Sequence, residues 1–363
     1  QIPWEKYTQD NLDLPNAKHQ LDSTHFGLDQ VKERILEYIA ILHLQRDQRN
    51  QISQKRDPIP DNTKQVPTIN PPSLQLEQTQ QVAQTSVVQP ISVVQPVRPV
   101  QTSHLPQPEE ISQIDKMVKL EGSSSRAPII CLVGVQGIGK TSIAKSIAQA
   151  MGRRFVRISL GGIAHVSELR GTSRSEIDSE PGQVVKALIR TEVMNPLILM
   201  DEIDKVSDFG GVRADVMATL LEILDPEQNA TFRDYYIDYP VDLSQVMFVC
   251  TANNLGGISA ALLDRLEVVR MSSYTDEEKE HIAKDYLFPK VVSATGINPG
   301  SIKFSETVWP LMIRPLGFDA GIRQLERNIT TLVRKIAKKM VEGQGSVFEI
   351  TPENFREYLP EDF

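Results

Sequence analysis

A glycine-rich segment between an apolar run and a helical run constrains the fold of this chain more than any other feature. The segment GVQGIGKTS, residues 134–142, follows the apolar run PIICLVG and leads into the helical stretch TSIAKSIAQAM. This order matches the pattern G-x-x-x-x-G-K-[ST], whose glycines let consecutive backbone N–H groups turn toward phosphate oxygens. The helix that follows directs the positive end of its dipole to the same place. The sequence therefore predicts a nucleotide-phosphate loop between a strand and a helix.

Each residue of this loop is a candidate for contact with the nucleotide. Lys140 can reach the terminal phosphates, and Thr141 can ligate Mg²⁺. The residues predicted to bind the phosphates are Gly134, Val135, Gln136, Gly137, Ile138, Gly139, Lys140, Thr141 and Ser142. A chance glycine-rich turn is the alternative, and the strand and helix on either side argue against it.

A second apolar run, residues 197–200, is followed directly by two acids. A buried strand here would present Asp201 and Glu202 at its carboxyl end. We expect Asp201 to hold Mg²⁺, directly or through water, and Glu202 to orient and deprotonate an attacking water molecule. Together with the phosphate loop, this pair predicts ATP and Mg²⁺ as cofactors.

Three further polar side chains are candidates for sensing the nucleotide. Asn253 ends the apolar run VMFVCTAN, where it can help to place water near the γ-phosphate, although strand ends also favour turn-forming residues. Arg265 in LLDRLE could reach a neighbouring protomer's nucleotide in a ring; taken by itself it would be an ordinary solvated arginine. Arg323 in GIRQLE lies off the apolar stripe of its helix and can point toward a ligand.

Alternating apolar runs and helical stretches over residues 127–274 predict an α/β unit with a parallel sheet and helices on both faces. The runs are PIICLVG, FVRISL, PLILMD and VMFVCTA. Over residues 275–363 we expect no further strands. A capping box of Thr275 with Glu278 begins this mostly helical unit. An apolar stripe at helical spacing follows, on Ile322, Leu325, Ile329, Leu332, Val333 and Ile336.

Residues 46–126 differ in composition from the rest of the chain. Between residues 51 and 110 the sequence is rich in Gln and Pro, has no Gly and no aromatic residue, and contains SVVQP twice. Such a segment has too little apolar surface to offset its chain entropy, so we expect a disordered or loosely extended insertion. A Pro-rich docking segment is the alternative. Residues 1–45 form a helical entry segment, so the insertion interrupts a domain at a surface loop.

Composition excludes several classes. The net charge of −8 argues mildly against a surface built for nucleic acid, without excluding a local basic patch. Cys131 and Cys250 lie in apolar runs and predict two buried thiols, and two cysteines exclude a disulfide scaffold. The six histidines show no metal-ligand spacing, and no apolar run is long enough for a membrane span. No signal peptide is visible, although Gln1 leaves room for a segment upstream.

The motifs, together with LEILDPEQNATFRDYYIDYPVDLSQVMFVCTAN and IPWEKYTQDNLDLPNAKHQLDSTHFGLDQVKERILEYIA, resemble the AAA+ module of the Lon ATP-dependent proteases. The resemblance covers nearly the whole chain except the insertion. It implies a ring, commonly of six copies, in which ATP hydrolysis drives unfolded or damaged proteins through a central pore. It implies roles for Asn253 as first sensor, Arg265 as arginine finger and Arg323 as second sensor. It also places His25, Phe26 and Gly27 beside the adenine.

The sequence departs from this family on the polypeptide side. The family loop that corresponds to residues 171–182 resembles G-H-R-R-T-Y-[VI]-G-x-x-P-G, and its aromatic–aliphatic pair grips the translocating chain. Here the corresponding residues are Glu176, Ile177 and Asp178. An aromatic ring can wedge against a passing polypeptide, whereas a hydrated carboxylate slides past it. We therefore expect this loop to form but its hold on the substrate chain to change. A second segment, usually G-D-P, reads GVRADVMATLL.

These observations favour an ATPase that feeds protein substrates to a peptidase domain. The rival hypothesis is a nucleotide-binding scaffold or regulatory paralogue that joins rings without threading substrate. No Ser–Lys dyad can be assigned, so we expect either a fragment, which Gln1 favours, or loss of the peptidase half. The insertion and the segments APIICLVG and RISLGG resemble fungal or other eukaryotic peroxisomal Lon. This favours an organelle matrix, the peroxisome before the mitochondrion.

Overall fold

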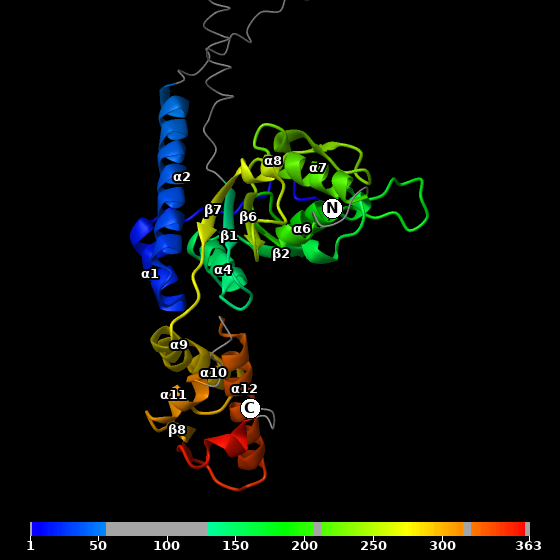
Figure 1. Cartoon of the computed structure of the whole chain (residues 1–363). Coiled ribbons are helices and arrows are strands. Elements are labelled where there is room, and N and C mark those ends of the chain that lie inside the picture. Colours follow the sequence, from blue (N-terminus) through cyan, green and yellow to red (C-terminus); the bar gives the residue numbers. More distant parts are fainter. Residues whose placement is uncertain (1, 56–128, 207–211, 315–320, 360–363) are drawn as a thin grey trace, which may run out of the picture. The chain divides into compact units, whose positions relative to one another are not determined.

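The computed structural model describes residues 2–55, 129–206, 212–314 and 321–359 (Figure 1). The chain divides into two units, of which Gln1–Gln48 with Arg126–Phe363 form the first and Arg49–Ser125 the second. The predicted insertion, residues 46–126, lies largely outside the described residues. Its first residues continue helix α2, Asp29–Lys55, so the expectation of an irregular chain is wrong there. The reason is local, because Gln, Arg and Lys favour helix and no Gly or Pro occurs between Gly27 and Pro58.

A five-stranded sheet forms the centre of the α/β part and confirms the predicted fold class. Its order is β2-β3-β6-β1-β7, and every neighbouring pair is parallel. The strands are β1 (Ile129–Val133), β2 (Phe155–Ser159), β3 (Leu197–Asp201), β6 (Met247–Ala252) and β7 (Leu266–Arg270). The edge strand β7 was not predicted, because Glu267 and Arg270 interrupt its apolar residues, so its sequence has no long apolar run.

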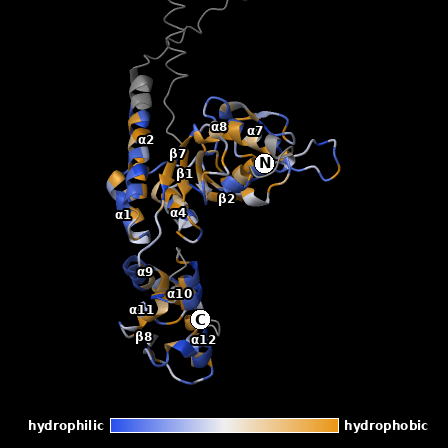
Figure 2. Ribbon diagram, in the orientation of Figure 1, coloured by the Kyte–Doolittle hydropathy of each residue, from blue (hydrophilic) through white to orange (hydrophobic). Residues whose placement is uncertain are grey.

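Helices cover both faces of this sheet (Figure 1). Because successive side chains of a strand point to opposite faces, Ile130 packs in one apolar core and its neighbour Cys131 in the other. The first core takes side chains from α1 (Leu14–Thr24), α2 and α4 (Lys140–Ala150). The second takes side chains from α5 (Val166–Arg170), α6 (Gln183–Thr191), α7 (Val212–Leu224) and α8 (Ala260–Leu263). Apolar residues accordingly concentrate along the sheet and on the helix faces that cover it (Figure 2).

The second part is mostly helical, as predicted. It contains α9 (Asp276–Ile282), a π-helical turn (Ala283–Leu287), α10 (Phe288–Thr295), α11 (Val308–Ile313) and α12 (Arg323–Val341). The capping box is present, since the Thr275 side chain accepts from the Glu278 N–H and Glu278 from the Thr275 N–H. The expectation of no strands is wrong. Short strands β8 (Ile302–Phe304) and β9 (Phe348–Ile350) pair in parallel, a long-range contact that three-residue segments do not signal in sequence.

Short elements complete the described chain. A hairpin joins β4 (Phe232–Arg233) to β5 (Pro240–Val241). The 3₁₀ turns are Leu160–Gly162, Ile203–Lys205, Asn229–Thr231, Pro299–Ser301 and Phe355–Tyr358. Among the helices that the structure describes, none combines the length and apolar character that a membrane crossing needs.

Candidate nucleotide site

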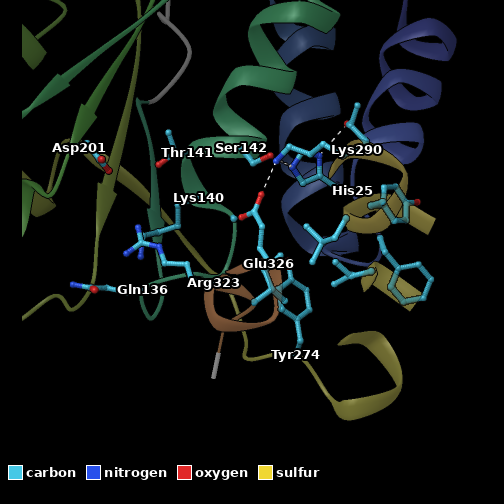
Figure 3. A pocket seen from close by; sticks show the side chains of 18 of the residues that line it. His25, Gln136, Lys140, Thr141, Ser142, Asp201, Tyr274, Lys290, Arg323 and Glu326 are labelled. Carbon is cyan, nitrogen blue, oxygen red and sulfur yellow. Dashed lines mark hydrogen bonds and ion pairs between the residues drawn. The ribbon is translucent and has the colours of Figure 1, made fainter. Parts of the chain in front are cut away.

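One cavity of about 290 Å³ brings together most of the residues predicted to contact a nucleotide (Figure 3). Of the predicted set, the residues that line it are His25, Phe26, Gln136, Gly137, Gly139, Lys140, Thr141, Ser142, Asp201, Glu202, Asn253 and Arg323. They come from the α1–α2 junction, the loop between β1 and α4, the first turn of α4, the ends of β3 and β6, and the start of α12. Because β1, β3 and β6 are parallel neighbours, their carboxyl ends meet at one edge, the usual ligand edge of an open α/β sheet.

The glycines of the loop between β1 and α4 have the conformations that a phosphate cradle requires. Gly137 has φ +84° and Gly139 has φ +95°, a region that residues with a Cβ rarely adopt. At Gly134 a Cβ would lie 2.8 Å from the backbone oxygen of Met271, so a side chain there would meet backbone. Gly139 is also the N-cap of α4, so the first N–H groups of that helix open toward the cavity.

Three predicted loop residues do not line the cavity. Gly134 and Val135 are not among the residues that line it; Gly134 packs against the backbone of Met271, and Val135 is exposed. Ile138 is fully buried, and its carbonyl accepts a hydrogen bond from the Tyr274 hydroxyl at 2.9 Å. Burial raises the pKa of Tyr274 to about 12, which keeps this donor protonated. Ile138 therefore anchors the loop rather than facing a ligand.

Lys140 lies across the opening of the loop. Its ammonium donates to the carbonyls of Gly134 and Val135, the latter at 3.0 Å, and to Asn253 Oδ1 at 3.0 Å. Burial lowers the pKa of Lys140, and the carboxylates of Asp201 and Asp204 act in the opposite direction. An ammonium held by neutral oxygens gains energy when anionic oxygens replace them, so the arrangement fits a triphosphate.

Asp201 is buried and held by two neighbours. Arg157 of β2 donates to it at 2.6 Å, and the Thr251 hydroxyl of β6 donates to its other oxygen. Thr251 also accepts from the Glu202 N–H at 3.0 Å and so links both acids. No sequence pattern singled out Arg157 or Thr251, whose roles come from neighbouring strands.

The donor set fits Mg²⁺ as a nucleotide-bound ion. Thr141 and Asp201 offer hydroxyl and carboxylate oxygens, the ligand class that Mg²⁺ prefers. No group of three or more His, Cys, Asp or Glu side chains in the described part of the chain could hold a metal. The remaining ligands of Mg²⁺ would therefore come from phosphate and water, as is usual for this ion.

The far end of the cavity is more apolar and contains the predicted adenine-side residues. His25 is buried, and its Nε2 lies 3.1 Å from Ser142 Oγ. Burial, aided by the charge of Lys32, lowers the pKa of His25 to about 4, so the ring is neutral. Phe26 stacks on His281 with ring centroids 4.6 Å apart. Gly27 does not line the cavity but has φ +62° at the turn that follows.

Tyr274, just before the helical part, and the helical part itself supply lining residues that the sequence did not reveal. They are Tyr274, Ile282, Tyr286, Leu287, Lys290, Ile322 and Glu326. Lys290 and Glu326 form an ion pair at 2.9 Å (Figure 3). Their positions follow from docking of this part onto the phosphate loop, where the Ile322 N–H donates to the Gly137 carbonyl at 3.1 Å. Arg323 packs on the same loop, since a Cβ at Gly137 would lie 3.1 Å from Arg323 Cγ.

Arg265 is not among the residues that line this cavity. Its guanidinium donates to Asp225 Oδ2 at 3.2 and 3.1 Å and to the Ala261 carbonyl at 2.7 Å. Burial raises the pKa of Asp225, but hydrogen bonds from the Glu227 N–H and from Arg265 outweigh it, and the net shift is downward. Asp225 therefore fixes the side chain of Arg265 outside this cavity.

The acidic loop, residues 171–182, joins α5 to α6 and projects from the α/β part (Figure 1). Ile177 is 95% exposed between the exposed acids Glu176 and Asp178. The loop is closed at its base, where the Thr172 N–H donates to the Glu180 carbonyl at 3.0 Å and the Gly182 N–H to Asp234 Oδ2 at 2.8 Å. The segment GVRADVMATLL begins outside the described residues and continues into α7.

A parallel five-stranded sheet, a phosphate loop, strand-end acids and a helical lid define an AAA-type ATPase module. Residues 130–274 match the family model described as ATPase family associated with various cellular activities. Residues 293–347 match the model described as the Lon protease AAA+ ATPase lid domain.

Alignments that cover nearly all of this chain indicate the same family. The chain is 37% identical over 360 residues to Lon protease of Endomicrobium trichonymphae and 36% over 359 residues to Lon protease of Halothermothrix orenii. It is 36% identical over 358 residues to Lon protease 2 of Thermus thermophilus. Each alignment covers 99% of this chain and 35 or 36% of the relative, so the chain spans about a third of these proteins. The chain belongs to the Lon protease family and forms its AAA+ ATPase module.

Proposed function

We propose that this module hydrolyses ATP in a Mg²⁺-dependent reaction. The observation that carries the proposal is the convergence of Lys140, Asp201, Glu202 and Asn253 on one cavity beside the N-terminus of α4. Cations, hydrogen-bond donors and a helix N-terminus there can stabilise the charge that develops during phosphoryl transfer.

Each group that lines the cavity has its own role in the proposed reaction. The loop N–H groups and Lys140 bind the phosphates, while Thr141 and Asp201 hold Mg²⁺, which neutralises phosphate charge when bound. Glu202 accepts the proton of the attacking water, and Asn253 helps to orient that water. His25, which is buried, and Phe26, which is partly buried, hold the adenine on the apolar side of the cavity.

Steady-state ATP turnover of the purified chain tests this proposal. Replacing Glu202 by Gln keeps the shape of the side chain but removes the base, so we expect turnover to fall by about 10²-fold or more while nucleotide binding persists. Lys140→Ala should lose binding as well. Equal turnover of the wild-type chain and Glu202→Gln would contradict the assignment.

We further propose that copies of this module form a ring of six and thread unfolded or damaged proteins toward a peptidase domain. Membership of the family supports this, as does the placement of Arg265 outside its own cavity. In a ring Arg265 would act on the neighbour's nucleotide, and residues Glu176, Ile177 and Asp178 would meet the substrate.

The exposed acidic loop also supports a second candidate, a scaffold or regulatory form that binds nucleotide without threading substrate. Degradation of an unfolded, basic-rich protein by the full-length enzyme distinguishes the two. We expect slow or selective degradation that Glu176→Tyr accelerates, because an aromatic ring can wedge against any chain. Robust degradation without the substitution would exclude the scaffold.

For the cellular location we propose an organelle matrix, with the peroxisome ahead of the mitochondrion. The proposal rests on the insertion and on the segments APIICLVG and RISLGG. Imaging of the full-length protein with an internal fluorescent tag, beside markers of both organelles, tests it.

A further inference from the structure

Gly161, which lies outside the phosphate loop and the strand-end acids, is directly against the side chain of Glu202. The 3₁₀ turn Leu160–Gly162 follows strand β2. A Cβ at Gly161 would lie 2.6 Å from Glu202 Oε2, closer than real Cβ contacts allow. At the next residue, Gly162, a Cβ would have nothing within 4 Å.

The backbone does not require glycine at either position. Neither Gly161 nor Gly162 has a φ in the left-handed region, so alanine fits both backbones. At Gly161 the obstacle is the far end of one side chain, since the next nearest atoms are Cβ and Cδ of Glu202 at 3.7 Å. An added methyl group at Gly161 would therefore displace a carboxylate without disturbing the core.

Both sides of this contact are held firmly by their surroundings. Ser159 pairs in register with Asp201 across β2 and β3, and Leu160 is fully buried. Glu202 itself has φ +61°, and its N–H donates to Thr251 Oγ1. Because neither backbone can withdraw easily, the side chain of Glu202 must absorb any conflict.

We propose that Gly161 is a positioning residue for Glu202: its missing Cβ leaves the space in which the carboxylate lies at the cavity. The inference rests on the proposed role of Glu202 as the base in ATP hydrolysis. A displacement of about 1 Å at a reacting group can lower a rate by about 10²-fold. One methyl group added at Gly161 is therefore large enough to slow ATP hydrolysis.

The test compares Gly161→Ala with the matched control Gly162→Ala in the same chain. We expect Gly161→Ala to lower kcat for ATP by about tenfold or more, with KM, affinity for ADP and the melting temperature close to those of the wild type. Gly162→Ala should match the wild type in all four measurements. A structural role would lower stability or binding together with kcat.

A double-mutant cycle with Glu202→Asp shows whether the effect passes through the carboxylate. The aspartate side chain is one methylene shorter, so it should avoid the new methyl group and make the Gly161→Ala penalty smaller. Equal penalties in both backgrounds would overturn the inference, as would a Gly161→Ala enzyme with the kcat of Gly162→Ala.

The variant Glu202→Gln distinguishes a failure of the base assignment from a failure of the positioning role of Gly161. If Glu202→Gln is inactive while Gly161→Ala is fully active, the base assignment stands and the positioning role of Gly161 is wrong. If Glu202→Gln keeps wild-type turnover, the base assignment is wrong and the inference falls with it.

Discussion

At the scale of single residues, the contact between Arg265 and Asp225 explains how an exposed arginine can keep a defined direction. The side chain of Arg265 is about one-third exposed, yet two of its nitrogens donate to one buried carboxylate oxygen. Asp225 in turn accepts from the Glu227 N–H at 2.9 Å and from Gln228 at 2.9 Å. A guanidinium anchored in this way has already lost most of its rotamer freedom, so in the proposed ring it would lose little more on contact with a neighbouring copy.

Replacing Asp225 by Asn tests this anchor. The substitution keeps the shape but removes the charge, and hydrogen bonds between charged groups are worth about 1.5–3 kcal/mol. If Arg265 acts across the proposed ring, we expect ATP turnover to fall by about tenfold, with nucleotide affinity nearly unchanged. Asp238→Asn is the control, since Asp238 pairs with Arg233 where both side chains are exposed. Equal turnover of the two variants would contradict the role of Asp225.

His25 makes the stability of the module depend on pH. Its pKa is about 4 in the folded chain against an ordinary value of 6.5, so between these values the unfolded chain binds more protons. Stability contributed by neutral His25 is therefore complete above about pH 6.5 and is lost as pH falls toward 4. Urea unfolding should show a loss of about 2 kcal/mol from this group between pH 7.5 and pH 5.

The variant His25→Asn isolates this contribution from other titrating groups. We expect it to be less stable at neutral pH but to lose less stability than the wild type on acidification. A pH dependence identical to that of the wild type would show that His25 is not the responsible group.

At the scale of an element, helix α12 shows where an apolar stripe is interrupted. The six stripe residues predicted from spacing are buried or partly buried, and a polar residue, Asn328, is fully buried beside them. Its Oδ1 accepts from Gln324 at 3.1 Å, but its Nδ2 has no hydrogen-bond partner. A buried donor without a partner costs stability.

Asn328→Leu should therefore stabilise the lid. The substitution removes the unsatisfied amide and adds apolar contacts, so we expect the free energy of unfolding to rise by about 1–2 kcal/mol. Arg327→Leu on the exposed side of the same helix is the control, with an expected change within about 0.5 kcal/mol. Denaturant unfolding measures both, and a destabilised Asn328→Leu would indicate that Asn328 has an unrecognised partner.

At the scale of the whole molecule, the lid and the α/β part meet at the candidate site. Tyr274 and Ile322 each bond to the phosphate loop, and Arg323 packs over it. A ligand in the cavity would touch both parts, so its binding energy adds to the stability of the entire unit.

A non-hydrolysable ATP analogue should raise the melting temperature of the wild-type chain. At a concentration of about 100 times Kd the gain is about 2.7 kcal/mol, and Arg323→Ala should reduce it by weakening the lid contact. Arg334→Ala, at an exposed position on the same helix, should behave as the wild type. An unchanged shift in Arg323→Ala would mean that Arg323 does not contribute to nucleotide binding.

The fold class and most of the cavity lining could be predicted because their signals are local. A phosphate loop occupies consecutive residues, and the acids follow an apolar run directly, so spacing alone reveals Lys140, Asp201 and Glu202. For the adenine side of the cavity, the sequence predicted only the residues of the segment HFG. Tyr286 and Lys290 lie on amphipathic helical segments that look ordinary until the lid docks against the loop.

The sequence by itself determined the α/β class, the phosphate loop and the order of the strand-end acids, since these depend on residue type at short separation. The tertiary structure decided that Thr251 links the two acids, that Asp225 holds Arg265, and that Gly161 lies against Glu202. These contacts join residues about 40 or more positions apart, and their formation depends on strand register and burial, which no local spacing encodes.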